Sequence, residues 1–168
     1  LGGWQTEELA DCVRGPIDWV TTLRMGDTDM SAADSLKWIH EGRIALTTVQ
    51  GRFTATNSLS GWDFAMLYRG VEMVVKAVEI ASTGRVSHTH SLVVLSQKVG
   101  LWGTLPPEHQ QIIRLLERYG PSTNYPDNPG HHTLTNSTSP VEANRILTGV
   151  SSLFDFVEHL VSTDLASP

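Results

Sequence analysis

The stretch GWDFAMLYRGVEMVVKAVEIA, residues 61–81, constrains the fold more than any other part of the chain. Its apolar residues recur at spacings of three and four, which places them on one side of an α-helix. These residues are Phe64, Leu67, Val71, Val74, Val75 and Val78. Ser60 is positioned to cap the start of the helix, and Gly84 to end it. Because so apolar a helix needs partners to cover it, we expect it at the centre of a helical bundle.

The charged residues of this stretch fall mostly on the opposite side of the expected helix. They are Asp63, Arg69, Glu72, Lys76 and Glu79. Glu72 precedes Lys76 by four residues, which is the favourable orientation for a helical ion pair. We favour an ordinary exposed ion pair or a dimer contact for these two residues, with Lys76 as a ligand-binding candidate in the alternative interpretation.

Four further helices are expected around the central one, over residues 31–53, 91–99, 107–119 and 139–162. Ser31 and Ser139 open the first and last of them with capping-box patterns, and proline starts the third. Thr47, Thr48 and Gly51 lower the helix propensity late in the first helix, so we expect it to fray or kink there. No stretch alternates apolar and polar residues over strand length, so we expect no sheet.

The fold class predicted from this pattern is all-α. We expect an antiparallel four- to five-helix bundle over residues 31–162, with a helical N-terminal arm, residues 1–30, and a C-terminal tail, residues 163–168. A chain of 168 residues is long enough for one domain with its own core.

The charge and cysteine content narrow the class of protein. A net charge of −6 argues against a broad nucleic-acid-binding face, while leaving room for a local basic pocket. Cys12 is the only cysteine, so we expect no internal disulfide and a reducing, cytoplasmic location. We see no signal peptide and no uncharged apolar run of membrane-spanning length, so we expect no membrane partner.

The motifs, taken in order, resemble those of the HEPN domain family, named for higher eukaryote and prokaryote nucleotide binding. The central helix carries Glu-x-x-x-Lys-Ala, starting at Glu72, and His-Thr-His-Ser-Leu follows at residues 88–92. A later helix ends in Arg-Tyr at residues 118–119, Asn-Tyr-Pro-Asp occupies residues 124–127, and a final helix opens at Ser139. The resemblance covers about residues 31–162.

This resemblance implies a helical bundle that is usually a homodimer. Some members of the family are metal-independent ribonucleases of defence or toxin–antitoxin systems, with an arginine and a histidine separated by four to six residues. Others lack that pair and bind nucleotides or protein partners, often beside a minimal nucleotidyltransferase. Arg85 and His90 have the ribonuclease spacing, and a histidine and an arginine suit proton transfer and phosphate stabilisation in RNA cleavage. In the alternative, this loop has the structural role of the family's His-x-His-Asp-Leu sequence.

A second candidate site lies in the long irregular segment that starts at residue 118. Proline, glycine, asparagine and threonine dominate it, and a loop of this length is either functional or poorly ordered. Arg114 and Arg118 are candidates for phosphate binding, and Tyr119 or Tyr125 for stacking on a base. The family usually has arginine where this chain has Asn124. In the alternative, Tyr125 and the following proline hold the loop on the bundle and Arg118 pairs with Asp127.

We expect neither a metal site nor a cofactor. His88, His90, His131 and His132 lack the cysteine or helical spacing typical of zinc ligands. The function that we favour is a nucleotide- or RNA-interacting module of a prokaryotic toxin–antitoxin, defence or regulatory system, with a cognate nucleotidyltransferase-type partner. The alternatives are an endoribonuclease that uses Arg85 and His90, and a non-catalytic interaction or dimerisation domain.

Overall fold

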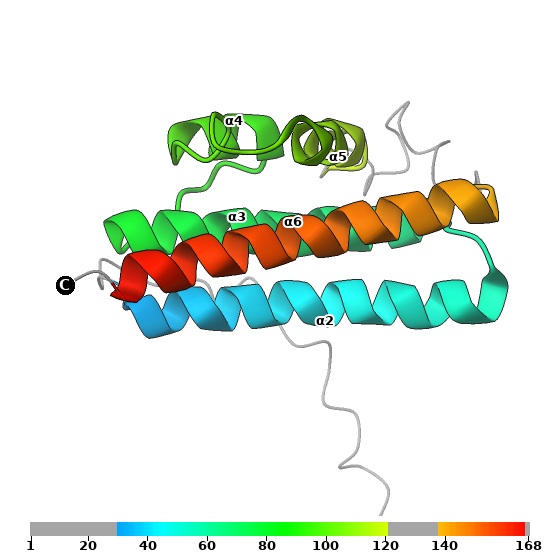
Figure 1. Cartoon of the computed structure of the whole chain (residues 1–168), viewed down its shortest axis with the longest axis horizontal. Helices are drawn as coiled ribbons and strands as arrows, with labels where there is room; N and C mark the ends of the chain where they lie inside the picture. Colours follow the sequence, from blue (N-terminus) through cyan, green and yellow to red (C-terminus); the bar gives the residue numbers. More distant parts are fainter. Residues whose placement is uncertain (1–29, 121–137, 167–168) are drawn as a thin grey trace, which may run out of the picture.

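A computed structural model describes residues 30–120 and 138–166, which contain five α-helices and no strand (Figure 1). The helices are α2 (Ala32–Thr56), α3 (Gly61–Thr83), α4 (Leu92–Lys98), α5 (Pro107–Glu117) and α6 (Pro140–Ala166). The all-α prediction is therefore confirmed. Residues 1–29 of the expected arm lie outside the described residues. Within the described ranges, no helix has both the length and the hydrophobicity to traverse a lipid bilayer.

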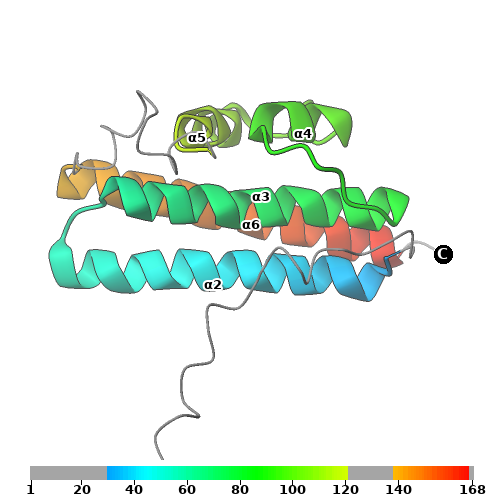
Figure 2. The same ribbon diagram turned by 180° about the vertical axis from the view of Figure 1, so that it is seen from behind.

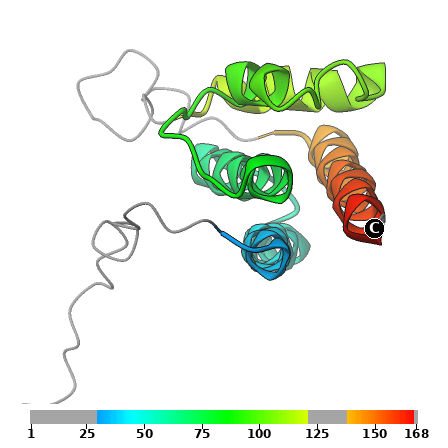
Figure 3. The ribbon, with the colours of Figure 1, turned by 90° about the vertical axis from the view of Figure 1, so that its left-hand side faces the viewer.

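The long helices α2, α3 and α6 lie side by side, and the shorter α4 and α5 form a layer on top of them (Figures 1 and 2). Seen along the bundle, α3 lies between α2 and the α4–α5 layer, with α6 alongside (Figure 3). Helix α3 contacts each of the other four helices, which confirms its predicted central position. Its apolar residues, including Leu67, Val71 and Val74, are completely buried.

The predicted caps define where the helices begin and end. Ser60 and Asp63 form a reciprocal capping box at the start of α3, and Gly84 ends the helix in a left-handed conformation with φ 67°. Ser31 and Asp34 form the same box at the start of α2. The Met30 backbone N–H donates to the carbonyl oxygen of Gly84 at 2.7 Å, which places the start of the described chain beside the end of α3.

Helices α2 and α6 extend farther than the sequence predicts. Helix α2 continues to Thr56 without the expected break, and the hydroxyl groups of Thr48, Thr54 and Thr56 donate to carbonyl oxygens one turn earlier. Asn57 then ends the helix with φ 56°. Helix α6 continues to Ala166 and so includes part of the expected tail.

The contact between α2 and α3 is made close by two glycines. A Cβ atom placed on Gly42 would lie 2.7 Å from the Gly70 carbonyl oxygen and 2.7 Å from Cγ2 of Val74. A Cβ atom placed on Gly70 would lie 3.0 Å from the Gly42 carbonyl oxygen. Glycine at both positions therefore lets the two backbones approach directly.

The prediction that the charged residues of α3 lie on an exposed side was wrong for most of them. Glu72, Lys76 and Glu79 are only 3%, 6% and 3% exposed, and Asp63 is also buried. The α4–α5 layer covers the side of α3 that would otherwise face water. Cations from other elements then neutralise two of these carboxylates: Arg52 contacts Asp63 at 2.7 Å, and Lys98 contacts Glu79 at 2.6 Å.

A buried histidine makes stability depend on pH. His109 of α5 is 4% exposed, its Nε2 lies 3.1 Å from the Ser152 hydroxyl, and its Nδ1 has no hydrogen-bond partner. Burial lowers the pKa of His109 below its usual 6.5. The unfolded chain therefore takes up a proton at this residue before the folded chain does, so its contribution to stability is present above pH 6.5 and lost as the pH falls.

Replacing His109 with leucine should remove this contribution. Between pH 7 and pH 5, the free energy of unfolding of His109→Leu should fall less than that of the wild type, by at most about 1.4 kcal/mol per pH unit. Urea denaturation of both proteins across this range measures the difference. A difference that stays constant with pH would contradict the assignment.

Candidate functional site

Four side chains form a cluster on α3 and the loop that follows it, which we call the Glu72 cluster: Arg69, Glu72, Lys76 and His90. Glu72 Oε1 lies 2.7 Å from Lys76 Nζ and 2.9 Å from His90 Nδ1. Glu72 Oε2 accepts from the Arg69 guanidinium at 3.0 Å. Burial alone would raise the pKa of Glu72, but Lys76, His90 and Arg69 hold it below its usual value. Glu72 is therefore a buried, charged carboxylate that orients its neighbours.

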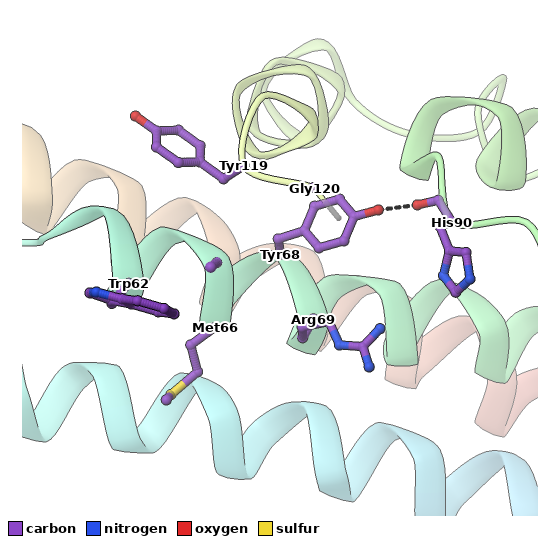
Figure 4. Close-up of a pocket in the computed structure, with 8 residues that line it drawn as sticks. Trp62, Met66, Tyr68, Arg69, His90, Tyr119 and Gly120 are labelled. Carbon is purple, nitrogen blue, oxygen red and sulfur yellow. Dashed lines mark hydrogen bonds between the residues drawn. The ribbon is translucent and has the colours of Figure 1, made fainter. Parts of the chain in front are cut away.

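Two members of the cluster reach solvent. The side chains of Arg69 and His90 are 56% and 53% exposed, and both lie along the same side of α3 (Figure 4). Because Nδ1–H of His90 donates to the Glu72 carboxylate, the neutral imidazole carries its lone pair on Nε2. This arrangement presents a base and a guanidinium beside each other.

The backbone around His90 is held on both sides. The buried Tyr68 hydroxyl donates to the carbonyl oxygen of His90 (Figure 4), and burial raises the pKa of Tyr68. On the other side, the Glu117 carboxylate accepts from the backbone N–H groups of Leu92 at 2.7 Å and Val93 at 3.3 Å. The imidazole is thus positioned by α3, α4 and α5 together.

A pocket of about 440 Å³, which we call the α3 pocket, opens beside the Glu72 cluster. Its lining is Trp62, Ala65, Met66, Tyr68, Arg69, His90, Tyr119 and Gly120 (Figure 4). Trp62 is 61% exposed although it is a large apolar residue. Tyr119 stacks on Phe64 with ring centroids 4.3 Å apart. The pocket therefore combines aromatic surface with an arginine and a histidine, which suits a planar group that carries an anion.

Only one residue of the predicted catalytic pair, Arg85 and His90, lines the α3 pocket. His90 lines it, whereas Arg85 lies in the exposed loop just after α3, where its backbone N–H contacts the Thr83 hydroxyl at 3.2 Å. The arginine that shares Glu72 with His90 is Arg69, which was not among the candidates. Arg69 stands three residues before Glu72 on the same helix, and this spacing was the available signal.

The other predicted residues are divided between two sites and a part of the chain outside the described residues. Tyr119 lines the α3 pocket, whereas Lys76 does not line it and is buried with its ammonium on Glu72. Arg114 and Arg118 line a second cavity, between α5 and α6. Tyr125, Asp127, His131 and His132 lie outside the described residues. Within residues 30–120 and 138–166, no three histidine, cysteine or carboxylate side chains are grouped as metal ligands would be.

Comparison with known proteins agrees with this architecture. The crystal structure of TT1696 from Thermus thermophilus is similar in fold, with a TM-score of 0.56 and 20% sequence identity over 74% of this chain and 96% of that chain. A search of the curated proteins finds no significant match. The HEPN domain matches residues 56–160, which is more than half of the chain. The protein described here therefore belongs to the HEPN domain family.

Proposed function

We propose that this protein is a nucleotide- or RNA-interacting module whose binding site is the α3 pocket. The observation that carries the proposal is the pairing of exposed aromatic surface, provided by Trp62, with Arg69 and His90 oriented on a buried carboxylate. Stacking of a base on an aromatic ring contributes about 1–3 kcal/mol, and an arginine binds phosphate through its planar guanidinium. A nucleotide presents both groups.

The proposed biological setting follows from the family. Some of its members act in defence or toxin–antitoxin systems, and we propose a prokaryotic toxin–antitoxin, defence or regulatory setting for this chain, inside the cell, with a nucleotidyltransferase-type partner. We further propose a homodimer. This proposal rests on the family, whose members usually form homodimers.

A second candidate function is endoribonuclease activity, favoured by the contact between Glu72 and His90. In this reaction His90 Nε2 takes the proton of a ribose 2′-hydroxyl, the 2′-oxygen attacks phosphorus, and the 5′-oxygen leaves with a proton from water. Arg85 is the arginine with the family spacing, and Arg69 is the one that shares Glu72 with His90. Either guanidinium would stabilise the charge that develops on the phosphate.

Binding to the α3 pocket is tested by removing its aromatic and cationic groups separately. Trp62→Ala and Arg69→Gln should each weaken the binding of adenosine monophosphate by about 1–3 kcal/mol, or roughly 5- to 150-fold, because each removes one recognition element. Isothermal titration calorimetry measures the change. Leu36→Ala removes an exposed apolar side chain from α2, and Lys37→Gln breaks another pair spaced by three residues, so these controls should bind as the wild type does.

The same proteins separate binding from catalysis. Incubation of the wild type with transfer and messenger RNA, beside His90→Ala, tests the ribonuclease function; no cleavage by the wild type would exclude it. If Trp62→Ala and Arg69→Gln bind the nucleotide as tightly as the two controls, the α3 pocket is not the binding site.

A further inference from the structure

The groove between α5 and α6 is lined by three arginines. Arg114 and Arg118 come from α5 and its C-terminal cap and Arg145 from α6, and all three line the same cavity. The cavity measures about 520 Å³, and the buried side chain of Ile112 with Gly149 forms part of its lining. A Cβ atom on Gly149 would lie 2.7 Å from Ile112 Cδ1, so the two helices are closely packed at this level. We call this cavity the α5–α6 groove.

These three arginines differ from the other cations of the described chain. Six cations have a carboxylate within ion-pair distance: Lys37, Arg43, Arg52, Arg69, Lys76 and Lys98. Arg85 also has an interaction. In residues 30–120 and 138–166, no ion pair involves the three groove arginines, although Glu108 and Glu142 also line the groove. The partner that the structure gives Arg114 is the face of Trp102, 5.3 Å away.

This distribution of charge is informative because the whole chain carries a net charge of −6. Carboxylates outnumber cations in the chain, so a cation without a carboxylate at ion-pair distance is the exception. The three arginines come from α5, its C-terminal cap and α6, and they outnumber the two glutamates of the groove on an otherwise acidic protein. Guanidinium groups bind phosphate oxygens in pairs of parallel hydrogen bonds, so the groove has the chemistry of a polyphosphate or phosphodiester site.

The lining of the α5–α6 groove and the lining of the α3 pocket contain consecutive residues at the end of α5. Arg118 lines the groove, while the next two residues, Tyr119 and Gly120, line the pocket. Consecutive Cα atoms are about 3.8 Å apart, so one short stretch of backbone separates the two cavities. Both Arg118 and Glu142, a residue of the groove, act electrostatically on the Tyr119 hydroxyl. The end of α5 therefore contributes to both linings.

We propose that the α5–α6 groove binds the phosphates of a single-stranded RNA whose base occupies the α3 pocket. This inference rests on the proposed function and narrows its ligand from a free nucleotide to an RNA strand. The pocket supplies stacking and the groove supplies charge, which is the division of roles found in proteins that bind single strands. A mononucleotide fills only the pocket, so an RNA strand binds more tightly and its binding depends more strongly on salt.

The test compares the dependence of RNA binding on salt in two doubly substituted proteins. Fluorescence anisotropy with a labelled single-stranded oligouridine gives the affinity over a series of potassium chloride concentrations. In Arg118→Gln/Arg145→Gln the affinity should fall, and the slope of log K against log salt should become shallower by about 1.4, since each phosphate contact contributes about 0.7. Lys37→Gln/Arg43→Gln also loses two positive charges, both on α2, which lines neither cavity, and should keep the wild-type slope.

Each outcome decides between the groove and the pocket. If the groove variant keeps the wild-type affinity and slope while Trp62→Ala weakens RNA binding, the groove is excluded and the proposed function stands. If the wild type binds neither adenosine monophosphate nor oligouridine, both proposals fail. If Arg118→Gln/Arg145→Gln weakens the binding of adenosine monophosphate as much as the binding of oligouridine, the α5–α6 groove does not bind the phosphates of an RNA strand. Circular dichroism melts establish that the variants are folded, and Arg118→Lys/Arg145→Lys should restore most of the salt dependence.

Discussion

Replacing Gly42 with alanine should lower the free energy of unfolding by about 3 kcal/mol, because overpacking a rigid contact destabilises a core by this amount. The added Cβ would lie 2.7 Å from the carbonyl oxygen of Gly70. A backbone atom of a central helix cannot move away by a change of rotamer, as a flexible side chain can. Relief therefore requires α2 and α3 to separate. Such a movement would loosen the apolar contacts that these two helices share along much of their length.

The same substitution at Gly51 should have the opposite sign. Gly51 belongs to the same helix and is exposed, and a Cβ atom there would meet no atom within 4 Å. Alanine should therefore raise the free energy of unfolding by about 0.5–1 kcal/mol, because glycine is the poorer helix former. Urea denaturation of the wild type and both variants measures the two changes. Equal stability of Gly42→Ala and Gly51→Ala would show that the contact between α2 and α3 at Gly42 can accommodate a Cβ atom.

Replacing Lys76 with methionine should also lower the free energy of unfolding by about 3 kcal/mol, near the lower end of values for breaking a buried ion pair. Methionine fills most of the space but leaves the carboxylate of Glu72, which is only 4% exposed, without its nearest charge. Arg69 and His90 remain in contact with Glu72, and they keep the loss from being larger. Urea denaturation at neutral pH measures the effect.

Two further measurements separate loss of charge from loss of packing. Glu72→Leu/Lys76→Met removes both charges and should recover much of the stability that Lys76→Met loses. In the wild type the pKa of Glu72 is held below 4.5, so its stabilising contribution is present above pH 4.5 and lost as the pH falls through the lowered pKa. In Lys76→Met that pKa should rise, so the difference between the two proteins should shrink at acidic pH. A difference that does not change with pH would mean that packing alone is lost.

Apolar periodicity and capping residues were enough to predict the bundle. The spacing of Phe64, Leu67 and Val71 indicated the central place of α3, and Ser60 and Gly84 cap its two ends as expected. These signals are local, so a single sequence contains them. The burial of Glu72 and Lys76 was not predicted, because it depends on tertiary contacts of α3, such as that of Glu72 with His90 and the packing of α3 on the other four helices. Periodicity shows that one side of a helix is apolar, but it does not show what packs on the other side.

The candidate site was only partly predictable for the same reason. His90 was identified from its spacing to Arg85, yet the residue beside it on Glu72 is Arg69, from the preceding helix. Arg118 was identified as a phosphate-binding candidate, whereas Arg145 was missed. Arg145 lines the same groove as Arg118 because α5 packs on α6. The spacing of these two residues in the sequence does not indicate this contact. Site residues on neighbouring helices need the tertiary contact before they can be grouped.

The hydrogen bond between Met30 and Gly84 has a practical consequence for experiments on this protein. It brings the start of the described chain to the end of α3, and α6 finishes at the same end of the bundle (Figure 1). The α3 pocket begins at Trp62, in the first turn of α3, at the opposite end. A fluorophore or a surface tether attached at Met30 or at the end of α6 joins the bundle away from Trp62. Such an attachment should leave that end of the pocket open to a ligand in solution.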